Sequence, residues 1–230
     1  MRPLVIYKDL GLVEYRQAWD AQREIFDGLV AQKTGAAGDV RPTLILCEHP
    51  HVYTLGKSGD EHNLLMGEEF LAGIGATYVR IDRGGDITYH GPGQLVGYPI
   101  LDLEALGLGL RDYIHTLEGA LIETVADFGI AAGRLEGAAG VWLTAGVGRP
   151  LRKIAAIGVR SSRHITMHGF ALNVCPMLEY FGYINPCGFT DRGVTSIDKE
   201  RPRGTVQVTM DEVKRSFLKH FGRMFRADVA

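Results

Sequence analysis

The sequence predicts an α+β fold in which helices pack on a mixed β-sheet, within one domain that spans residues 1–230. The chain has 230 residues, of which 46% are hydrophobic and 23% are charged, as in ordinary globular proteins. Three widely spaced segments have helical periodicity, and strand-like runs follow one another through the middle of the chain. That order favours helices packed on a mixed sheet over a regular alternation of strands and helices. A chain of this length buries about 70% or more of its unfolded surface, so its core needs no disulfide or metal.

The helices are predicted from apolar residues that recur every three or four positions. The first segment covers residues 12–30, the second residues 113–128 and the third residues 210–225. Gly129 follows the second segment directly and is suited to the left-handed conformation that ends many helices.

The strands are predicted from short apolar runs separated by turns that contain Gly or Pro. Residues 33–41 are rich in Gly and Ala, and we interpret them as a loop and not as a domain boundary. The predicted strands are residues 4–7, 43–47, 76–81, 94–101, 141–143, 153–159 and 169–174.

The composition excludes several classes of protein. A net charge of −2 argues against a nucleic-acid-binding protein, which normally has a strong basic excess. No apolar run approaches the roughly 18–20 residues that span a bilayer, so we expect no membrane segment. The first residues lead directly into a strand pattern, which argues against a signal peptide. Three cysteines, an odd number, fit free thiols in a reducing compartment, and we therefore expect a cytoplasmic protein.

Among the cysteines, Cys187 is the candidate nucleophile because it stands between Pro186 and Gly188. Such a turn is tightly held and accessible, and the glycine leaves backbone N–H groups free to bind an oxyanion. Cys47 lies in an apolar strand and is most simply a small buried hydrophobe. Cys175 ends a predicted strand, and either role remains open for it. A structural role is the commoner one for any single cysteine, but for Cys187 we favour catalysis.

A cysteine nucleophile reacts as the thiolate, and a free thiol with a pKa of about 8.5 is only a few per cent ionised at neutral pH. One interpretation of the basic residues before Cys187 is a solvated hairpin edge, and the other is a source of the required cation or base. Lys153 stands out because it lies in an apolar run, where strand alternation places it on one face with Ala155, Ile157 and Val159. Partial desolvation there would lower the pKa of its amine. The basic residues are Arg149, Arg152, Lys153, Arg160, Arg163 and His164, with no acid between the first and the last.

Residues 83–94 form the most unusual segment, with four glycines among twelve residues. The segment is not a P-loop, because no Gly-Lys-Ser/Thr follows, and it is not a dinucleotide fingerprint, because no helix opens after Gly84 and Gly85. A glycine-rich hairpin would explain the glycines alone. The added polar side chains favour a slot beside a strand that accepts an extended apolar chain.

A zinc site at residues 47–51, which contain one cysteine and two histidines, would need a second pair of ligands at a matching distance. His62 and His90 do not have that spacing, so we expect no metal site.

The run Arg83-Gly84-Gly85-x-x-Thr88-Tyr89-His90-x-x-Gly93-Gln94-x-Val96-x-Tyr98 resembles the signature of the lipoyl(octanoyl) transferase family. The resemblance extends in family order over roughly residues 3–225. Its further motifs are residues 48–50, 53–56, 153–159, 168–173, 185–188 and 193–196.

The resemblance implies the fold of the biotin/lipoyl protein ligases and a reaction that moves an octanoyl (or lipoyl) group from acyl carrier protein to a protein lysine. The acceptors it implies are the lipoyl domains of 2-oxo acid dehydrogenase complexes and the glycine cleavage H protein. It implies no cofactor, and we expect a monomer. The family's catalytic Cys/Lys pair matches Cys187 and Lys153. Its substrate-binding positions match Arg83, Gly84, Gly85, Asp86, Ile87, Thr88, Tyr89, His90, Ala156, Ile157, Gly158, Gly169, Phe170 and Ala171.

The chemistry of the residues agrees with this reaction. Exchange of one thioester for another on Cys187 is nearly isoergic, and transfer to an amine forms a more stable amide, so no ATP is needed. Two alternatives remain. An ATP-dependent lipoate–protein ligase of the same fold would have no use for Cys187, and a non-catalytic module that docks an acyl carrier would leave Lys153 without a role as well.

Overall fold

The computed structural model describes residues 2–146, 149–185, 193–202 and 204–230. Within these residues, the main feature is a nine-stranded sheet with the order β12-β1-β2-β6-β10-β9-β8-β7, in which β11 pairs with β9. Strands β12, β1 and β2 run parallel, and the others on this path are antiparallel. The strands are β1 (Leu4–Leu12), β2 (Thr43–Glu48), β6 (Gln94–Ile100), β7 (Gly133–Leu135), β8 (Ala138–Leu143), β9 (Arg152–Ser162), β10 (Ile165–Asn173), β11 (Gly193–Val194) and β12 (Asp228–Val229).

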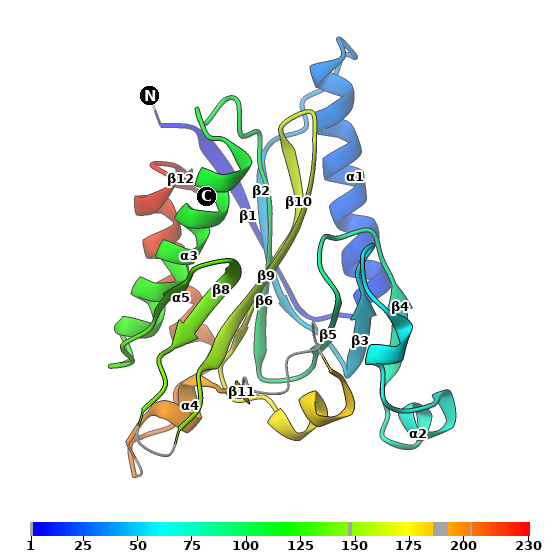
Figure 1. Cartoon of the computed structure of the whole chain (residues 1–230). Helices are drawn as coiled ribbons and strands as arrows, with labels where there is room; N and C mark the ends of the chain where they lie inside the picture. Colours follow the sequence, from blue (N-terminus) through cyan, green and yellow to red (C-terminus); the bar gives the residue numbers. More distant parts are fainter. Residues whose placement is uncertain (1, 147–148, 186–192, 203) are drawn as a thin grey trace.

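Three long helices cover the two faces of this sheet. Figure 1 shows α1 on one side and α3 with α5 on the other. The covering follows from the amphipathic pattern, since each helix buries its apolar stripe against the sheet. The helices are α1 (Tyr15–Lys33), α3 (Leu110–Ala126) and α5 (Met210–Met224), with two short ones, α2 (Glu68–Gly73) and α4 (Ile197–Glu200), and two 3₁₀ turns, η1 (Glu61–Asn63) and η2 (Leu178–Tyr183). Of the helices that the structure describes, none is both long and apolar enough to cross a membrane.

A second, three-stranded sheet lies on the α1 side of the molecule (Figure 1). Its order is β4-β3-β5, and it contains most of the Gly-rich segment. The strands are β3 (Val52–Leu55), β4 (Thr77–Arg80) and β5 (Ile87–His90). The two sheets are joined by the short turn between β5 and β6, which brings residues 83–94 next to the centre of the large sheet.

The predicted class, helices packed on a mixed sheet, is confirmed, and each predicted helix and strand lies on one in the structure. Residues 34–42 form a loop, as predicted, and this loop connects α1 to β2. Strands β3, β7, β11 and β12, which have two to four residues each, were not predicted.

Candidate active site

Two adjoining cavities are lined by residues of both sheets. The larger has a volume of about 340 Å³ and the smaller about 60 Å³. The larger cavity falls in the range of roughly 300–1,000 Å³ that small-molecule sites occupy. The cavities adjoin because they share the lining residues Arg83, Thr88, Ala156, Ile157 and Ala171.

Most of the residues predicted to bind substrate line these cavities, although they come from three separate segments of the chain. Tyr89 is the exception: its side chain is buried in an aromatic cluster, and its hydroxyl lies 2.8 Å from His51 Nδ1. The larger cavity is lined by Gly84, Gly85, Asp86, Ile87 and Lys153, the smaller by His90, Gly158, Gly169 and Phe170, and both by the shared residues.

Arg83 organises the Gly-rich loop from a buried position. Its guanidinium donates to the backbone oxygen of Thr54 at 2.8 Å and to that of Gly84 at 3.0 Å. The loop also bonds to the large sheet, since Gly84 N donates to Val159 O at 3.1 Å. Gly85 has a φ of +91°, which only glycine adopts at little cost.

Glycine is required where this loop crosses strand β9. A Cβ at Gly158 would lie 3.1 Å from Arg83 Cδ and 3.2 Å from Gly84 O, closer than most side chains approach. Gly158 pairs with Gly169 of β10, so two neighbouring strands lack side chains at the same level. At this level backbone forms part of the cavity wall, and acceptance of an extended apolar chain there stays a prediction.

Lys153 lies on the cavity side of β9, and the predicted face for it was wrong. A register shift between β8 and β9 pairs Val141 with Ala155 but Trp142 with Lys153. The inserted residue interrupts the alternation, as β-bulges do. Consequently, Ile154 and Ala155 both enter the core beneath α3 and α5. The half-buried Lys153 lines the larger cavity instead, with its Nζ 4.5 Å from the centre of the Trp142 ring.

The predicted nucleophile, Cys187, lies outside the described residues. The larger cavity is bordered by β9 and by two elements on either side of residue 187 in the chain. Turn η2 comes before this residue, and strand β11 comes after it. Cys47 is fully buried, as predicted, and burial raises the pKa of its thiol far above the usual range. Cys175 is exposed, so it is not a core residue, and its role stays open.

A chain of buried hydrogen bonds leads away from His90. Its Nδ1 lies 2.7 Å from Gln94 Oε1, and because that oxygen can only accept, Nδ1 carries the proton. Gln94 Nε2 donates to Asn173 Oδ1 at 2.8 Å, and Asn173 Nδ2 donates to Thr195 O at 2.9 Å. Burial lowers the pKa of His90 to about 3, so the imidazole is neutral. It can act as a positioned hydrogen-bonding group and not as a resting cation.

The smaller cavity includes side chains that sequence reasoning missed. Tyr15, Val96, Tyr98 and His168 line it from α1, β6 and β10. His168 is buried, and its Nε2 lies 2.9 Å from Asp82 Oδ1, while burial lowers the pKa of the imidazole. Tyr98 and His168 stand inside the family motifs, which was the available signal, but nothing in the sequence linked Tyr15 to them.

Three of the basic residues before Cys187, namely Arg149, Arg152 and Arg160, are paired with acids from other parts of the chain. Arg152 bonds to Glu200 at 2.6 Å, and Arg160 forms an ion pair with Asp82. Although residues 149–164 contain no acid, acids from elsewhere in the chain therefore neutralise part of their positive charge. Among the described residues, no group of three or more His, Cys, Asp or Glu side chains is arranged to bind a metal ion.

Comparison with known proteins identifies the family. Residues 14–222 match the lipoyl protein ligase A/B catalytic domain. The chain belongs to this family. The octanoyltransferase of Bacteroides fragilis (strain YCH46) is 58% identical over 210 residues, which are 91% of this chain and 92% of that protein. The octanoyltransferase of Flavobacterium johnsoniae is 49% identical over 235 residues and covers 100% of both chains.

Solved structures of the same family and of biotin ligases share the fold. The bi-partite lipoate protein ligase of Thermoplasma acidophilum aligns with a TM-score of 0.71 at 15% identity and covers 99% of this chain and 86% of its own. The biotin protein ligase of Aquifex aeolicus aligns with a TM-score of 0.51 at 12% identity and covers 98% and 71%. The predicted biotin/lipoyl ligase fold is thus confirmed. The family member described here is an acyltransferase, as predicted, because octanoyltransferases match it at high identity over nearly the whole chain.

Proposed function

We propose that the protein transfers an octanoyl (or lipoyl) group from acyl carrier protein to a lysine of a lipoyl domain, through a thioester on Cys187. The observation that carries the proposal is the gathering of Lys153 and the glycine-rich loop on one cavity of about 340 Å³, in a chain whose relatives are octanoyltransferases. Backbone and small side chains, such as Ala156 and Ala171, leave room there for an extended acyl chain.

In the first step, the Cys187 thiolate attacks the carbonyl carbon of the carrier's thioester. A new C–S bond forms, the bond to the carrier sulfur breaks, and the carrier leaves as a thiol after it takes up a proton. Lys153 assists by stabilising the thiolate if the amine is charged, or by taking the thiol proton if it is neutral. One thioester replaces another, so the step is nearly isoergic.

In the second step, the neutral amine of the acceptor lysine attacks the Cys187 thioester. A C–N bond forms, the C–S bond breaks, and Lys153 relays the proton that the amine loses to the departing thiolate. The amide product is more stable than the thioester, so transfer runs downhill without ATP.

We propose partners and a compartment for the protein on the same basis. The acceptors would be the lipoyl domains of 2-oxo acid dehydrogenase complexes and the glycine cleavage H protein, and the compartment would be the cytoplasm. Arg149, with a side chain 63% exposed, lies beside Glu200 near the Lys153 end of β9 and could contribute to the attraction of acidic partners.

The test is intact-protein mass spectrometry after incubation with octanoyl-carrier, with and without ATP. We expect the mass of the enzyme to rise by one octanoyl group without ATP, and the adduct to be released by hydroxylamine and absent from Cys187→Ala. Free octanoate with ATP should give no adduct. A requirement for ATP would instead support the lipoate–protein ligase alternative, and carrier binding without an adduct would support a docking module.

A further inference from the structure

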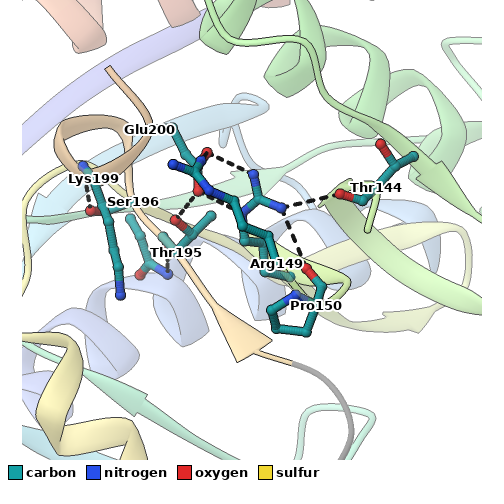
Figure 2. A network of polar contacts seen from close by, with 9 residues as sticks. Thr144, Arg149, Pro150, Thr195, Ser196, Lys199 and Glu200 are labelled. Atoms are coloured by element: carbon teal, nitrogen blue, oxygen red, sulfur yellow. Dashed lines mark hydrogen bonds and ion pairs between the residues drawn. The ribbon is translucent and has the colours of Figure 1, made fainter. Parts of the chain in front are cut away.

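Glu200, the last residue of α4, has a carboxylate that lines neither cavity but holds the strand on which Lys153 stands. Its side chain is only 7% exposed. Arg152 donates to both of its oxygens, at 2.6 Å from Nε and 2.7 Å from Nη2. Thr195 Oγ1 donates to Oε1 at 2.6 Å, and Arg149 approaches the carboxylate at 3.3 Å. Figure 2 shows Arg149 and Thr195 converging on the Glu200 carboxylate.

The bonds to Arg152 and Thr195 clamp the short strand β11 to the start of β9. Gly193 pairs with Arg152 and Val194 pairs with Lys153, so the two strands run side by side at this point. Thr195 N donates to Lys153 O at 2.9 Å. The backbone of Lys153 is therefore held by a residue whose side chain is itself held by Glu200.

The same clamp is connected to the cavity wall. Thr195 O accepts from Asn173 Nδ2, and Asn173 accepts from Gln94, the partner of His90. Gln94, Asn173 and Thr195 are all buried, which makes bonds of this kind costly to leave unmade. A displacement at Glu200 would therefore be transmitted to the side of the cavity where Lys153 lies.

We infer that Glu200 is a positioning residue: through Arg152 and Thr195 it holds the edge of β9 so that the Lys153 amine stands at the geometry that acyl transfer needs. The inference rests on the proposed function, since it assigns a role relative to Lys153. It is not a catalytic assignment, because Glu200 does not reach the cavity. An error in placement of about 1 Å can reduce a rate about 100-fold, so a supporting ion pair has a measurable effect.

The test uses the double variant Glu200→Gln/Arg152→Gln, which removes the ion pair without changing the net charge. The matched control is Asp9→Asn/Lys214→Gln, which removes a partly buried ion pair with a 2.7 Å contact that lines neither cavity. Wild type and Lys153→Ala are measured beside them. Three quantities are compared: the unfolding temperature, kcat and KM with octanoyl-carrier, and the pH dependence of thiol alkylation.

We expect the test variant to lose about 10- to 100-fold in kcat with KM changed less than twofold. Its alkylation profile should move from that of the wild type toward that of Lys153→Ala. The control should lower the unfolding temperature by a comparable amount while kcat and the alkylation profile stay as in the wild type. A test variant with the wild-type profile and kcat would overturn the inference and leave the proposed function standing. A Lys153→Ala profile identical to the wild type would instead overturn the role of Lys153, and the inference with it.

If the double variant does not fold, Thr195→Val takes its place, because it keeps the ion pair and removes only the hydroxyl that reaches Glu200. The same direction of change is expected, about threefold to tenfold in kcat, the size of one hydrogen bond. Unchanged kcat in a folded Thr195→Val enzyme would contradict the inference.

Discussion

The two faces of the large sheet differ in what they bury. Beneath α3 and α5, the core is apolar and rich in aromatic rings: Phe221 lies with its ring centre 5.7 Å from that of Phe217 and 4.5 Å from that of Phe225. On the opposite face, α1 covers a second apolar core, but the part toward the three-stranded sheet is hollow and borders the buried polar residues Arg83 and His90.

One face of the sheet therefore contributes mainly to the stability of the fold, and the other mainly to its chemistry. Burial of aromatic side chains contributes hydrophobic free energy to folding, and the phenylalanine rings need no hydrogen-bond partner. The hollow face is less tightly packed and buries polar groups, and most of these are hydrogen-bonded to neighbours, which offsets the cost of burying them. His168 Nδ1, in the lining of the smaller cavity, is buried without a hydrogen-bond partner among the described residues. Changes on the two faces should therefore have opposite signatures, and the predictions below test that separation.

The largest effect on activity should come from Cys187→Ala. Loss of a nucleophile removes the covalent route, so we expect turnover to fall by roughly 10⁴-fold or more. The unfolding temperature should stay within about 2 °C, since the substitution removes a single sulfur atom. Steady-state assays with octanoyl-carrier provide the measurement, and Cys175→Ala is the control that should remain active. An inactive Cys175→Ala with an active Cys187→Ala would reverse the assignment.

Lys153→Ala should reduce both half-reactions by roughly 10²- to 10³-fold, the usual contribution of a general acid–base group. Removal of the amine should return the Cys187 thiol toward an ordinary pKa of about 8.5. Lys153→Arg should restore part of the thiolate, because the charge remains, but not transfer, because arginine does not accept the proton. Iodoacetamide reactivity measured against pH distinguishes these cases. Superimposed curves for wild type and Lys153→Ala would mean that another base must be sought.

On the apolar face, Phe221→Ala should do the opposite, because among the described residues the ring contacts of Phe221 are with Phe217 and Phe225 and not with a cavity residue. The Phe221 side chain is fully buried, and its loss should cost about 3–5 kcal/mol of unfolding free energy. For a domain of this size, that lowers the unfolding temperature by roughly 6–20 °C. The kcat per folded molecule should change less than twofold. Calorimetry and an active-site titration check both parts, and a large loss of kcat at full folding would show that the two faces are coupled.

Acid should destabilise the fold through the buried histidines near the cavities. Burial lowers the pKa of His49 to about 4 and that of His90 to about 3, whereas both take up a proton near pH 6.5 when the chain is unfolded. Between these values the unfolded chain binds more protons, so the free energy of unfolding falls as the pH falls. Two such groups give a loss of about 2 kcal/mol between pH 6.5 and pH 5.5.

Urea unfolding at pH 7.5, 6.5 and 5.5 measures this loss, and His49→Gln should remove about half of the pH dependence. The carboxylates with lowered pKa values, such as Asp82 beside His168 and Glu200 beside Arg152, lose their contribution only at lower pH. Stability that is flat down to pH 5 would contradict the neutral state of the histidines.

Much of the fold could be predicted because its signals are local. The apolar stripes of α1, α3 and α5 can be recognised from helical spacing alone. The slot was indicated by the polar side chains that accompany the glycines of residues 83–94. The bulge that turns Lys153 toward the cavity was not predictable, because it arises from the pairing of β9 with β8. The ion pairs of Arg152 with Glu200 and Arg160 with Asp82 join residues 48 and 78 positions apart, and sequence spacing gives no sign of them.

The smallest effect concerns Arg149 and Arg163, two exposed arginines of the basic stretch that lie beyond opposite ends of β9. Strand β9 has 11 residues, so Arg149 and Arg163 flank it and lie roughly 35–45 Å apart along the chain at about 3.3 Å per residue. Of these two arginines, Arg149 is the one near the Lys153 end of the strand and the larger cavity. Exposed charges attract partners mainly over a screening length of about 8–10 Å at physiological ionic strength.

We therefore expect Arg149→Gln to raise KM for octanoyl-carrier by about twofold to fivefold at low salt, with kcat little changed. Arg163→Gln, the matched control at the exposed β9–β10 turn, should change KM less than 1.5-fold. The difference should vanish at about 0.5 M salt, where the screening length is shorter still. A larger effect from Arg163→Gln would place the carrier at the far end of the hairpin, away from the cavity.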